Sequence, residues 1–110
     1  MPHYMIQSNY NQDQIKAMVD NPQDRAEAFG KLVEGLGGKM ECLYFTFGDS
    51  DALAICELPD NEAAVACAMV VAGSGAASSF KTTVLVTSNQ AMEAMKKAGA
   101  ATGSYRHPSG

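Results

Sequence analysis

The 110-residue sequence has no tryptophan, three cysteines and two histidines. The cysteines, Cys42, Cys56 and Cys67, include no CxxC pair, and each lies in an apolar run. A disulfide framework or a structural zinc site requires more ligands at closer spacing than these. We interpret the three cysteines as free, buried thiols that act as small hydrophobic residues, which is consistent with a reducing, cytoplasmic compartment.

Positive charge and long apolar runs are also scarce. Lys and Arg together number 8 against 12 Asp and Glu, so the net charge is −4. A nucleic-acid-binding domain needs a basic face, so we expect no nucleic-acid partner. The longest uncharged stretch spans residues 63–80, but only residues 63–72 are strongly apolar, about half of a membrane span. The start of the chain has no basic or apolar leader pattern, so we expect a cytoplasmic protein with no membrane partner.

The hydrophobic pattern predicts four strands and four helices. Asn11 and Asp60 are candidate N-caps, Asn21-Pro22 separates two helices, and Gly37-Gly38 ends the second of them. The last helix is capped by Ser88 or Asn89. The predicted strands are residues 3–10, 39–47, 51–58 and 80–87, and the predicted helices follow Asn11, Pro22, Asp60 and Ser88.

This βαββαβ order, followed by a helix, predicts an α+β, ferredoxin-like fold. The expected sheet is antiparallel, with the fourth, first, third and second strands side by side and helices on one face. Within it we expect the first and third strands to be parallel neighbours. Residues 1–100 are expected to form a single domain, and residues 101–110 a polar C-terminal tail.

Both faces of the predicted sheet carry apolar side chains. We expect one side of the second strand to present Leu43, Phe45 and Phe47, and the other side Met40, Cys42 and Tyr44. The third strand is apolar on both sides as well. Helices cover only one face, so the other face needs a partner. The simplest partner is a second copy of the chain, in a homodimer or a higher oligomer. The helix over residues 63–72 is apolar all round, which favours further contacts.

Several segments together resemble the GYD domain family, over roughly residues 3–100. They are His3-Tyr4-Met5-Ile6-Gln7, Leu36-Gly37-Gly38-Lys39, Phe47-Gly48-Asp49-Ser50-Asp51, Glu57-Leu58-Pro59-Asp60-Asn61 and Phe80-Lys81-Thr82-Thr83. The resemblance implies a ferredoxin-like, dimeric α+β barrel protein of uncharacterised activity. The family commonly carries an aromatic residue where this chain has Ser50. If that aromatic lines a pocket, the resemblance implies a more open or more polar pocket here.

Two groups of polar residues are candidate sites. The expected strand directions place His3 beside Asp49 and Asp51, a pairing suited to general acid–base catalysis, although Asp is also an ordinary turn residue. The opposite edge of the sheet would then gather Tyr10, Lys39, Glu57 and Lys81. Lys81 is a candidate ligand for a carboxylate or phosphate, although a Lys–Glu pair across strand ends is more often a solvated salt bridge than a site.

An apolar cavity is the remaining candidate. Tyr44 and Phe47 are placed to line a space between sheet and helices, with a filled core as the alternative. The leading hypothesis is an oligomeric small-molecule-binding protein. The alternatives are a small cofactor-independent enzyme, of isomerase or monooxygenase type, and a purely structural assembly protein. No strand–GxGxxG–helix unit is present, so no nucleotide cofactor is expected, and no metal is expected.

Overall fold

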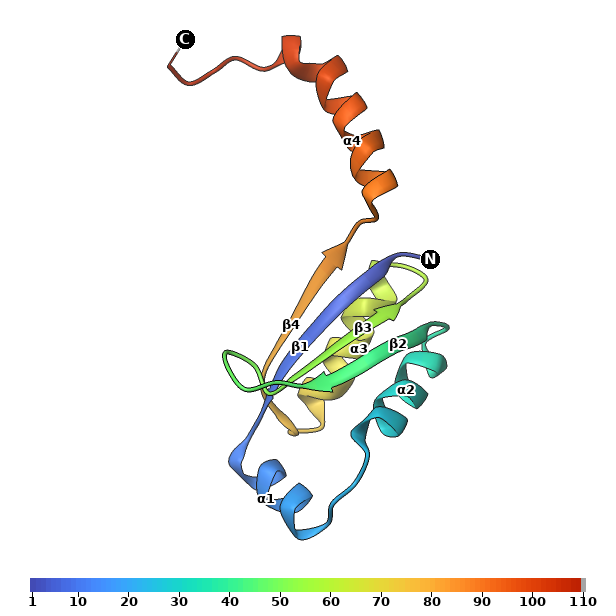
Figure 1. Ribbon diagram of the computed structural model, residues 1–110, viewed down its shortest axis with the longest axis vertical. Helices are drawn as coiled ribbons and strands as arrows, with labels where there is room; N and C mark the ends of the chain where they lie inside the picture. The colour runs from blue at the N-terminus through green and yellow to red at the C-terminus, as the bar shows by residue number, and fades with distance from the viewer. Residues whose placement is uncertain (110) are drawn as a thin grey trace.

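The computed structural model describes residues 1–109, which form a four-stranded sheet with helices on one face (Figure 1). The element order is βααββαβα, which confirms the α+β, ferredoxin-like prediction. In chain order the elements are β1 (His3–Tyr10), α1 (Gln12–Asp20), α2 (Arg25–Gly35), β2 (Lys39–Phe45), β3 (Ala52–Glu57), α3 (Asn61–Gly73), β4 (Ala77–Leu85), α4 (Ser88–Ala101) and a 3-10 turn (Thr102–Ser104).

The helix starts follow from side chains that accept hydrogen bonds from the first turn. Asn11 caps α1 and Asp60 caps α3, as the sequence predicts. Asp24 caps α2, after the break at Asn21-Pro22. Thr87 caps α4 in a capping box with Gln90, one residue before the predicted cap. Each cap satisfies a backbone N–H group that has no partner within its helix.

The strand order is β2-β3-β1-β4, as predicted, but every neighbouring pair is antiparallel. The expectation that β1 and β3 run parallel is therefore wrong. The connection through α1 and α2 returns the chain to the same end of the sheet, so β2 runs in the same direction as β1. The hairpin then reverses the chain, and β3 runs against both. His3 therefore lies opposite Glu57, at the end of β3, rather than beside the hairpin.

Strand register determines which residues face the helices. Tyr4 and Ile6 of β1 lie opposite Cys56 and Ala54 of β3, and all four are buried beneath α2 and α3. A β-bulge at Glu41 interrupts the alternation of β2. The bulge corrects the predicted assignment of β2 side chains to the two faces of the sheet. The side chains of Met40, Leu43 and Phe45 face the helices, and those of Cys42 and Tyr44 face the open side.

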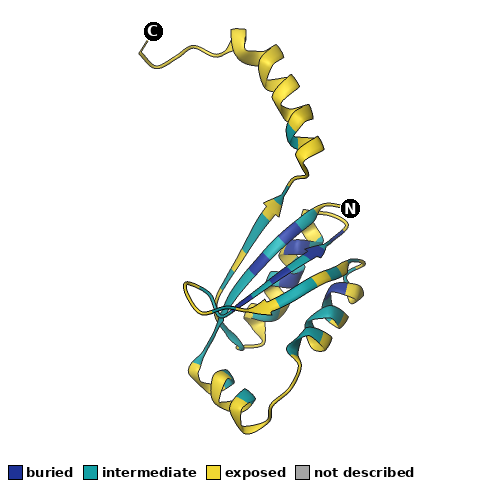
Figure 2. Ribbon diagram, in the orientation of Figure 1, coloured by how far each residue is buried: buried dark blue, intermediate teal, exposed yellow. Residues whose placement is uncertain are grey.

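The tightly packed part of the core lies at the His3 end of the sheet. Its fully buried side chains are Tyr4, Val33, Cys56, Leu58 and Cys67, contributed by β1, α2, β3 and α3 (Figure 2). The Tyr4 hydroxyl donates a 2.8 Å hydrogen bond to Oδ1 of Asn61, the first residue of α3. Because a buried hydroxyl without a partner costs free energy, this bond helps to fix α3 against β1.

Helix α4 leaves the sheet at the end of β4 and extends away from it (Figure 1). It makes extensive contact only with the 3-10 turn that follows it, and the structure measures 60 Å along its longest axis. The 3-10 turn occupies the first part of the expected polar tail. In the described chain, no helix combines the length and the apolar character needed to cross a membrane.

We expect Gly38→Ala to destabilise the protein, because Gly38 lies against β3. A Cβ atom there would be 2.1 Å from the Glu57 carbonyl oxygen and 2.8 Å from Leu58 Cδ2. Overpacking of this kind costs about 1–3 kcal/mol. Gly35→Ala is the matched control, because a Cβ atom at Gly35 meets nothing within 4 Å. Urea denaturation of both variants measures the difference, and equal stability would contradict the close approach.

Candidate functional site

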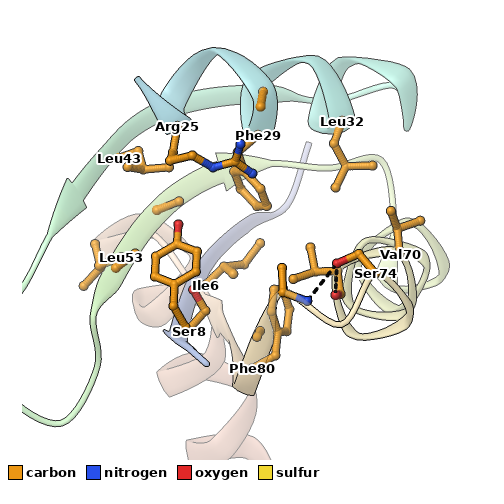
Figure 3. Close-up of a pocket in the computed structure, with 17 residues that line it drawn as sticks. Ile6, Ser8, Arg25, Phe29, Leu32, Leu43, Leu53, Val70, Ser74 and Phe80 are labelled. Atoms are coloured by element: carbon orange, nitrogen blue, oxygen red, sulfur yellow. Dashed lines mark hydrogen bonds between the residues drawn. The ribbon is translucent and has the colours of Figure 1, made fainter. Parts of the chain in front are cut away.

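A cavity of about 210 Å³ lies between the sheet and the helices, at the end of the sheet that carries the β2–β3 hairpin (Figure 3). Its walls come from every strand and from α2, α3 and the turn that follows α3. The lining residues include Ile6, Ala54, Phe29, Leu32, Val70 and Phe80. Most of this lining is apolar, so the cavity is suited to a hydrophobic group.

The hollow results from short side chains on the helix-facing side of the sheet. At the His3 end that side carries Tyr4, Cys56 and Leu58, which fill the space below the helices. Toward the hairpin the corresponding positions are Ser8 and Ala52, which are paired across β1 and β3. The sheet and helices cannot close over side chains that small, and the space between them stays open.

Four polar side chains border this apolar space: Ser8, Tyr10, Arg25 and Ser74. Arg25 is the first residue of α2, and its side chain extends beside Phe29 over the cavity (Figure 3). Its Nη1 donates a 2.9 Å hydrogen bond to Oε1 of Gln23. The Tyr10 ring stacks on Phe45, with ring centroids 5.9 Å apart. The cavity is therefore apolar inside, with one cationic group in its lining.

A second polar group lies on the opposite, open face of the sheet. His3 Nε2 is 3.3 Å from Oε1 of Glu41 and 3.7 Å from Oε1 of Glu57. The three side chains are partly exposed, and Glu41 joins them through the bulge in β2. One ligand atom from each side chain lies within 4.8 Å of the others.

The chemistry of this group is that of one imidazole between two carboxylates. The imidazole Nε2 is within 4 Å of an oxygen of each carboxylate. The same nitrogen and oxygen donors could hold a divalent cation such as Zn²⁺. The cavity is on the other face of the sheet, so this group does not line it.

The structure does not bring His3 to Asp49 or Asp51, so the expected proximity is wrong. The hairpin lies near the far end of β1, roughly 20 Å from His3 at about 3.3 Å per residue. Asp51 Oδ2 accepts a 2.9 Å hydrogen bond from the Tyr10 backbone N–H. The Asp49 backbone carbonyl accepts one from the Asn9 side chain. Both aspartates therefore lie where the hairpin meets β1.

The remaining predicted site residues also lie on different faces and at different ends of the sheet. Tyr10 lines the cavity, whereas Tyr44 is exposed on the open face and Phe47 is fully exposed in the hairpin. Lys81 lies opposite Gln7 on the open face. Lys39 and Glu57 lie at the His3 end, away from Tyr10, because β3 runs antiparallel to β1. The expected gathering of Tyr10, Lys39, Glu57 and Lys81 is therefore absent.

Comparison with known proteins agrees with the sequence resemblance. The family model of the GYD domain matches residues 4–95. The chain belongs to the GYD domain family. Among solved structures it is similar to the crystal structure of TTHA0845 from Thermus thermophilus, with 16% sequence identity and a TM-score of 0.46. That similarity covers 80% of this chain and 96% of the other. A comparison with curated proteins finds no match.

Sequence reasoning missed two residues of this GYD domain. Arg25 is preceded by the N-cap Asp24 and followed one turn later by Phe29, which together indicate a cation at a helix start beside an apolar face. Glu41 was not among the predicted site residues, because nothing in the local alternation marks a bulge. Ser50, the position of the missing aromatic, lies in the hairpin and does not line the cavity.

Two of the three thiols in the GYD domain are protected. Burial raises the pKa of the Cys67 thiol to about 11. Burial also raises the pKa of Cys56 to about 11, with smaller contributions from Cys67 and Glu41. The thiolate is the reactive form, so both are poor nucleophiles at neutral pH. Cys42 is half-buried on the open face. The cysteines are free, as predicted.

We expect Asp51→Ala to lower the free energy of unfolding by about 1–3 kcal/mol, because it leaves the Tyr10 N–H without its acceptor. Asp49→Ala is the matched control in the same hairpin. The Asp49 contact is made by its backbone carbonyl, which the substitution keeps, so the change should stay within about 0.5 kcal/mol. Chemical denaturation measures both variants, and equal losses would contradict a structural role specific to the Asp51 carboxylate.

We expect a disulfide reagent at pH 8 to modify Cys42 rapidly in the folded protein, and Cys56 and Cys67 only after denaturation.

The raised pKa values of Cys56 and Cys67 also predict a pH effect on stability. The folded state holds both thiol protons more tightly than the unfolded state, so stability is lost as pH rises from about 9 toward 11. Cys67→Ala should reduce this alkaline loss. Rapid modification of all three cysteines at pH 8 would contradict the burial.

Proposed function

We propose that this protein is an oligomeric binder of small organic molecules, and that the cavity beneath α2 and α3 takes an apolar ligand with an anionic group. The observation that supports this most strongly is the cavity of about 210 Å³, in whose lining Arg25 is the one formally charged residue. Binding sites for small molecules are commonly apolar hollows with a few polar groups that fix the orientation of the ligand.

The volume indicates the size of the ligand. An engineered apolar cavity of about 150 Å³ binds benzene. A space of about 210 Å³ therefore has room for an aromatic ring, or a branched alkyl group, with a short substituent. The Phe29 and Phe80 rings and the Leu32 side chain supply the apolar contacts.

Arg25 supports an anionic end on the ligand. Its guanidinium bonds to the neutral Gln23 amide, and no carboxylate forms an ion pair with it within the described residues 1–109. A guanidinium carries five donors in a planar fork, which matches the two oxygens of a carboxylate. A bound carboxylate would supply the missing counter-charge.

The arrangement favours binding over catalysis. General acid–base catalysis needs a titratable group within about 2.6–3.2 Å of the reacting atom. The described lining of the cavity includes no histidine, aspartate, glutamate or lysine, and its one phenol, Tyr10, is stacked on Phe45. His3, the residue on which the isomerase or monooxygenase alternative depends, lies on the other face of the sheet. A purely structural role predicts a filled core, and the cavity argues against that alternative.

The open face of the sheet supports self-association. Its apolar side chains include Met5, Cys42, Leu53 and Ile55, with Leu85 at the end of the edge strand β4, and no helix of the described chain covers them. A second copy stacked against this face would remove these apolar groups from water. The polar groups at its margins, which include His3 and Lys81, would surround such an interface.

We expect benzoate to bind in the cavity, with toluene as its uncharged counterpart. Arg25→Met keeps the apolar stem of the side chain but removes the charge-assisted hydrogen bonds, which contribute about 1.5–3 kcal/mol each. It should weaken benzoate binding by roughly 10-fold to 100-fold and leave toluene binding unchanged. Chemical-shift titration of the isotope-labelled protein measures both affinities and locates the bound molecule.

Lys31→Met is the matched control for this experiment. Lys31 lies on the same helix and pairs with Glu27 on the exposed side, outside the cavity lining. Its removal changes the net charge by the same amount and should leave benzoate affinity unaltered. Equal effects of the two substitutions would show non-specific charge attraction, and the absence of shifts at Phe29 and Phe80 in the wild-type protein would reject the cavity as the site.

A further inference from the structure

Helix α4 presents an apolar stripe that nothing in the described chain covers. Met92 and Met95 are 45% and 69% exposed. At helical spacing they share one side of α4 with Ala91, Ala98 and Gly99. We call these five residues the α4 stripe. An isolated helix of this length is only marginally stable in water, so α4 gains stability when its stripe is packed against another surface.

A groove of about 520 Å³ runs between α3 and β4 on the helix side of the sheet. Its floor includes Ala64, Ala68 and Ala72, which follow one another at four-residue spacing along α3. Its borders are formed by Val65 and Met69 of α3 and by Thr82 and Val84 of β4. Met69, Val84 and Val65 are 69%, 59% and 52% exposed, so the groove is apolar and uncovered.

We propose that α4 of a second copy of the chain occupies this α3/β4 groove and lies antiparallel to α3. This inference rests on the proposed self-association, and it identifies a contact on the face opposite to the open face of the sheet. The partner is another molecule of the same protein, and the groove is incomplete without its helix.

The two surfaces match in length and in shape. Helix α4 has 14 residues and α3 has 13, so at about 1.5 Å per residue each is roughly 20 Å long. The alanine row leaves space for the long, flexible side chains of Met92 and Met95. Small residues on one helix also allow the close approach of another.

Charge selects the antiparallel orientation. On a helical wheel, Lys96, which pairs with the exposed Glu93 of its own helix, flanks the α4 stripe, and Glu62 flanks the groove at the N-terminal end of α3. Antiparallel docking over the full length brings the C-terminal half of α4, with Lys96, to that end of α3. Parallel docking places Lys96 about two turns away from Glu62. Antiparallel packing also aligns the two helix dipoles favourably.

The same copy's α4 is poorly placed to fill the groove. β4 ends beside His3, at the end of the sheet where Tyr4 contacts Asn61 and α3 begins. A helix that folded back from there would run parallel to α3. Only Val86 and Thr87 join β4 to α4, and Thr87 is engaged in the capping box with Gln90, which fixes the start of the helix.

Crosslinking distinguishes a second copy from the same copy. We would introduce Val65→Cys and Met95→Cys together into a Cys42→Ser background, because Cys56 and Cys67 are buried. Mild oxidation should give covalent dimers or larger species on a non-reducing gel. Either single-cysteine variant should give far less. A monomer with an internal disulfide would show that α4 folds onto its own groove, and no crosslink would overturn the proposal.

A matched pair of lysine substitutions tests the stripe itself. Met95→Lys places a charge in the middle of the stripe, whereas Ala100→Lys places the same charge on the opposite side of α4. Sedimentation measurements on the full chain should show self-association weakened at least about tenfold by Met95→Lys and unchanged by Ala100→Lys. Equal behaviour of the two variants would overturn the proposal.

Ile55→Lys, on the open face of the sheet, separates this inference from the self-association on which it rests. If Ile55→Lys dissociates the protein and Met95→Lys does not, the open-face interface stands and the α4 contact is wrong. If the wild-type chain is monomeric, both are wrong. Benzoate binding to the cavity is measured independently and is unaffected by either result.

Discussion

The decrease in side-chain size along the helix-facing rows of β1 and β3 is the constraint on which the rest of the structure depends. At one end Tyr4, Cys56 and Leu58 fill the space below α2 and α3. At the other end Ser8 and Ala52 leave it hollow. The same two strands therefore provide a packed core that holds the helices in place and a cavity that the helices close. The packing contacts in the core at the His3 end compensate for those that are missing around the cavity.

Because successive side chains of a strand point to opposite faces, the cavity and the polar group around His3 lie on different sides of the sheet. Residues that face the helices create an apolar hollow with a single cation, Arg25, in its lining. Residues that face the other way bring His3 together with Glu41 and Glu57 on the open face, which also carries Lys81 and apolar side chains such as Ile55. The imidazole–carboxylate group and the apolar cavity are therefore on opposite sides of the sheet. The bulge at Glu41 strengthens this separation, because it turns a third titratable side chain toward the open face.

Local signals in the sequence predicted local structure well. The bounds of β1, the caps Asn11 and Asp60 and the strand order follow from alternation, cap chemistry and the βαββαβ pattern. Strand direction was predicted wrongly, and that one error moved His3 from the glutamates to the hairpin aspartates. The β2–β3 hairpin could have prevented this error, because a strand that follows β2 through a tight turn must run antiparallel to it and to the β1 strand beside it.

Other features of the candidate site could not be predicted from the hydrophobic pattern of the sequence. The cavity depends on how α2 and α3 rest on the sheet, which no residue spacing specifies. The contact between His3 and Glu41 depends on one extra residue in β2, which alternation alone does not reveal. Arg25 was visible as the residue after a helix cap, but its place beside Phe29 and over the hollow required the packed structure.

The projection of α4 has a consequence for the size of the cooperative unit. The radius of gyration of the chain is 17.9 Å, whereas a compact domain of this length has about 13 Å. Within residues 1–109, the chain therefore holds a folded sheet body and one helix without extensive tertiary contacts to it. When another molecule supplies such contacts, the stability of the helix follows mass action and increases with protein concentration. The sheet body has a buried core of its own, so dilution would then destabilise the helix more than the body.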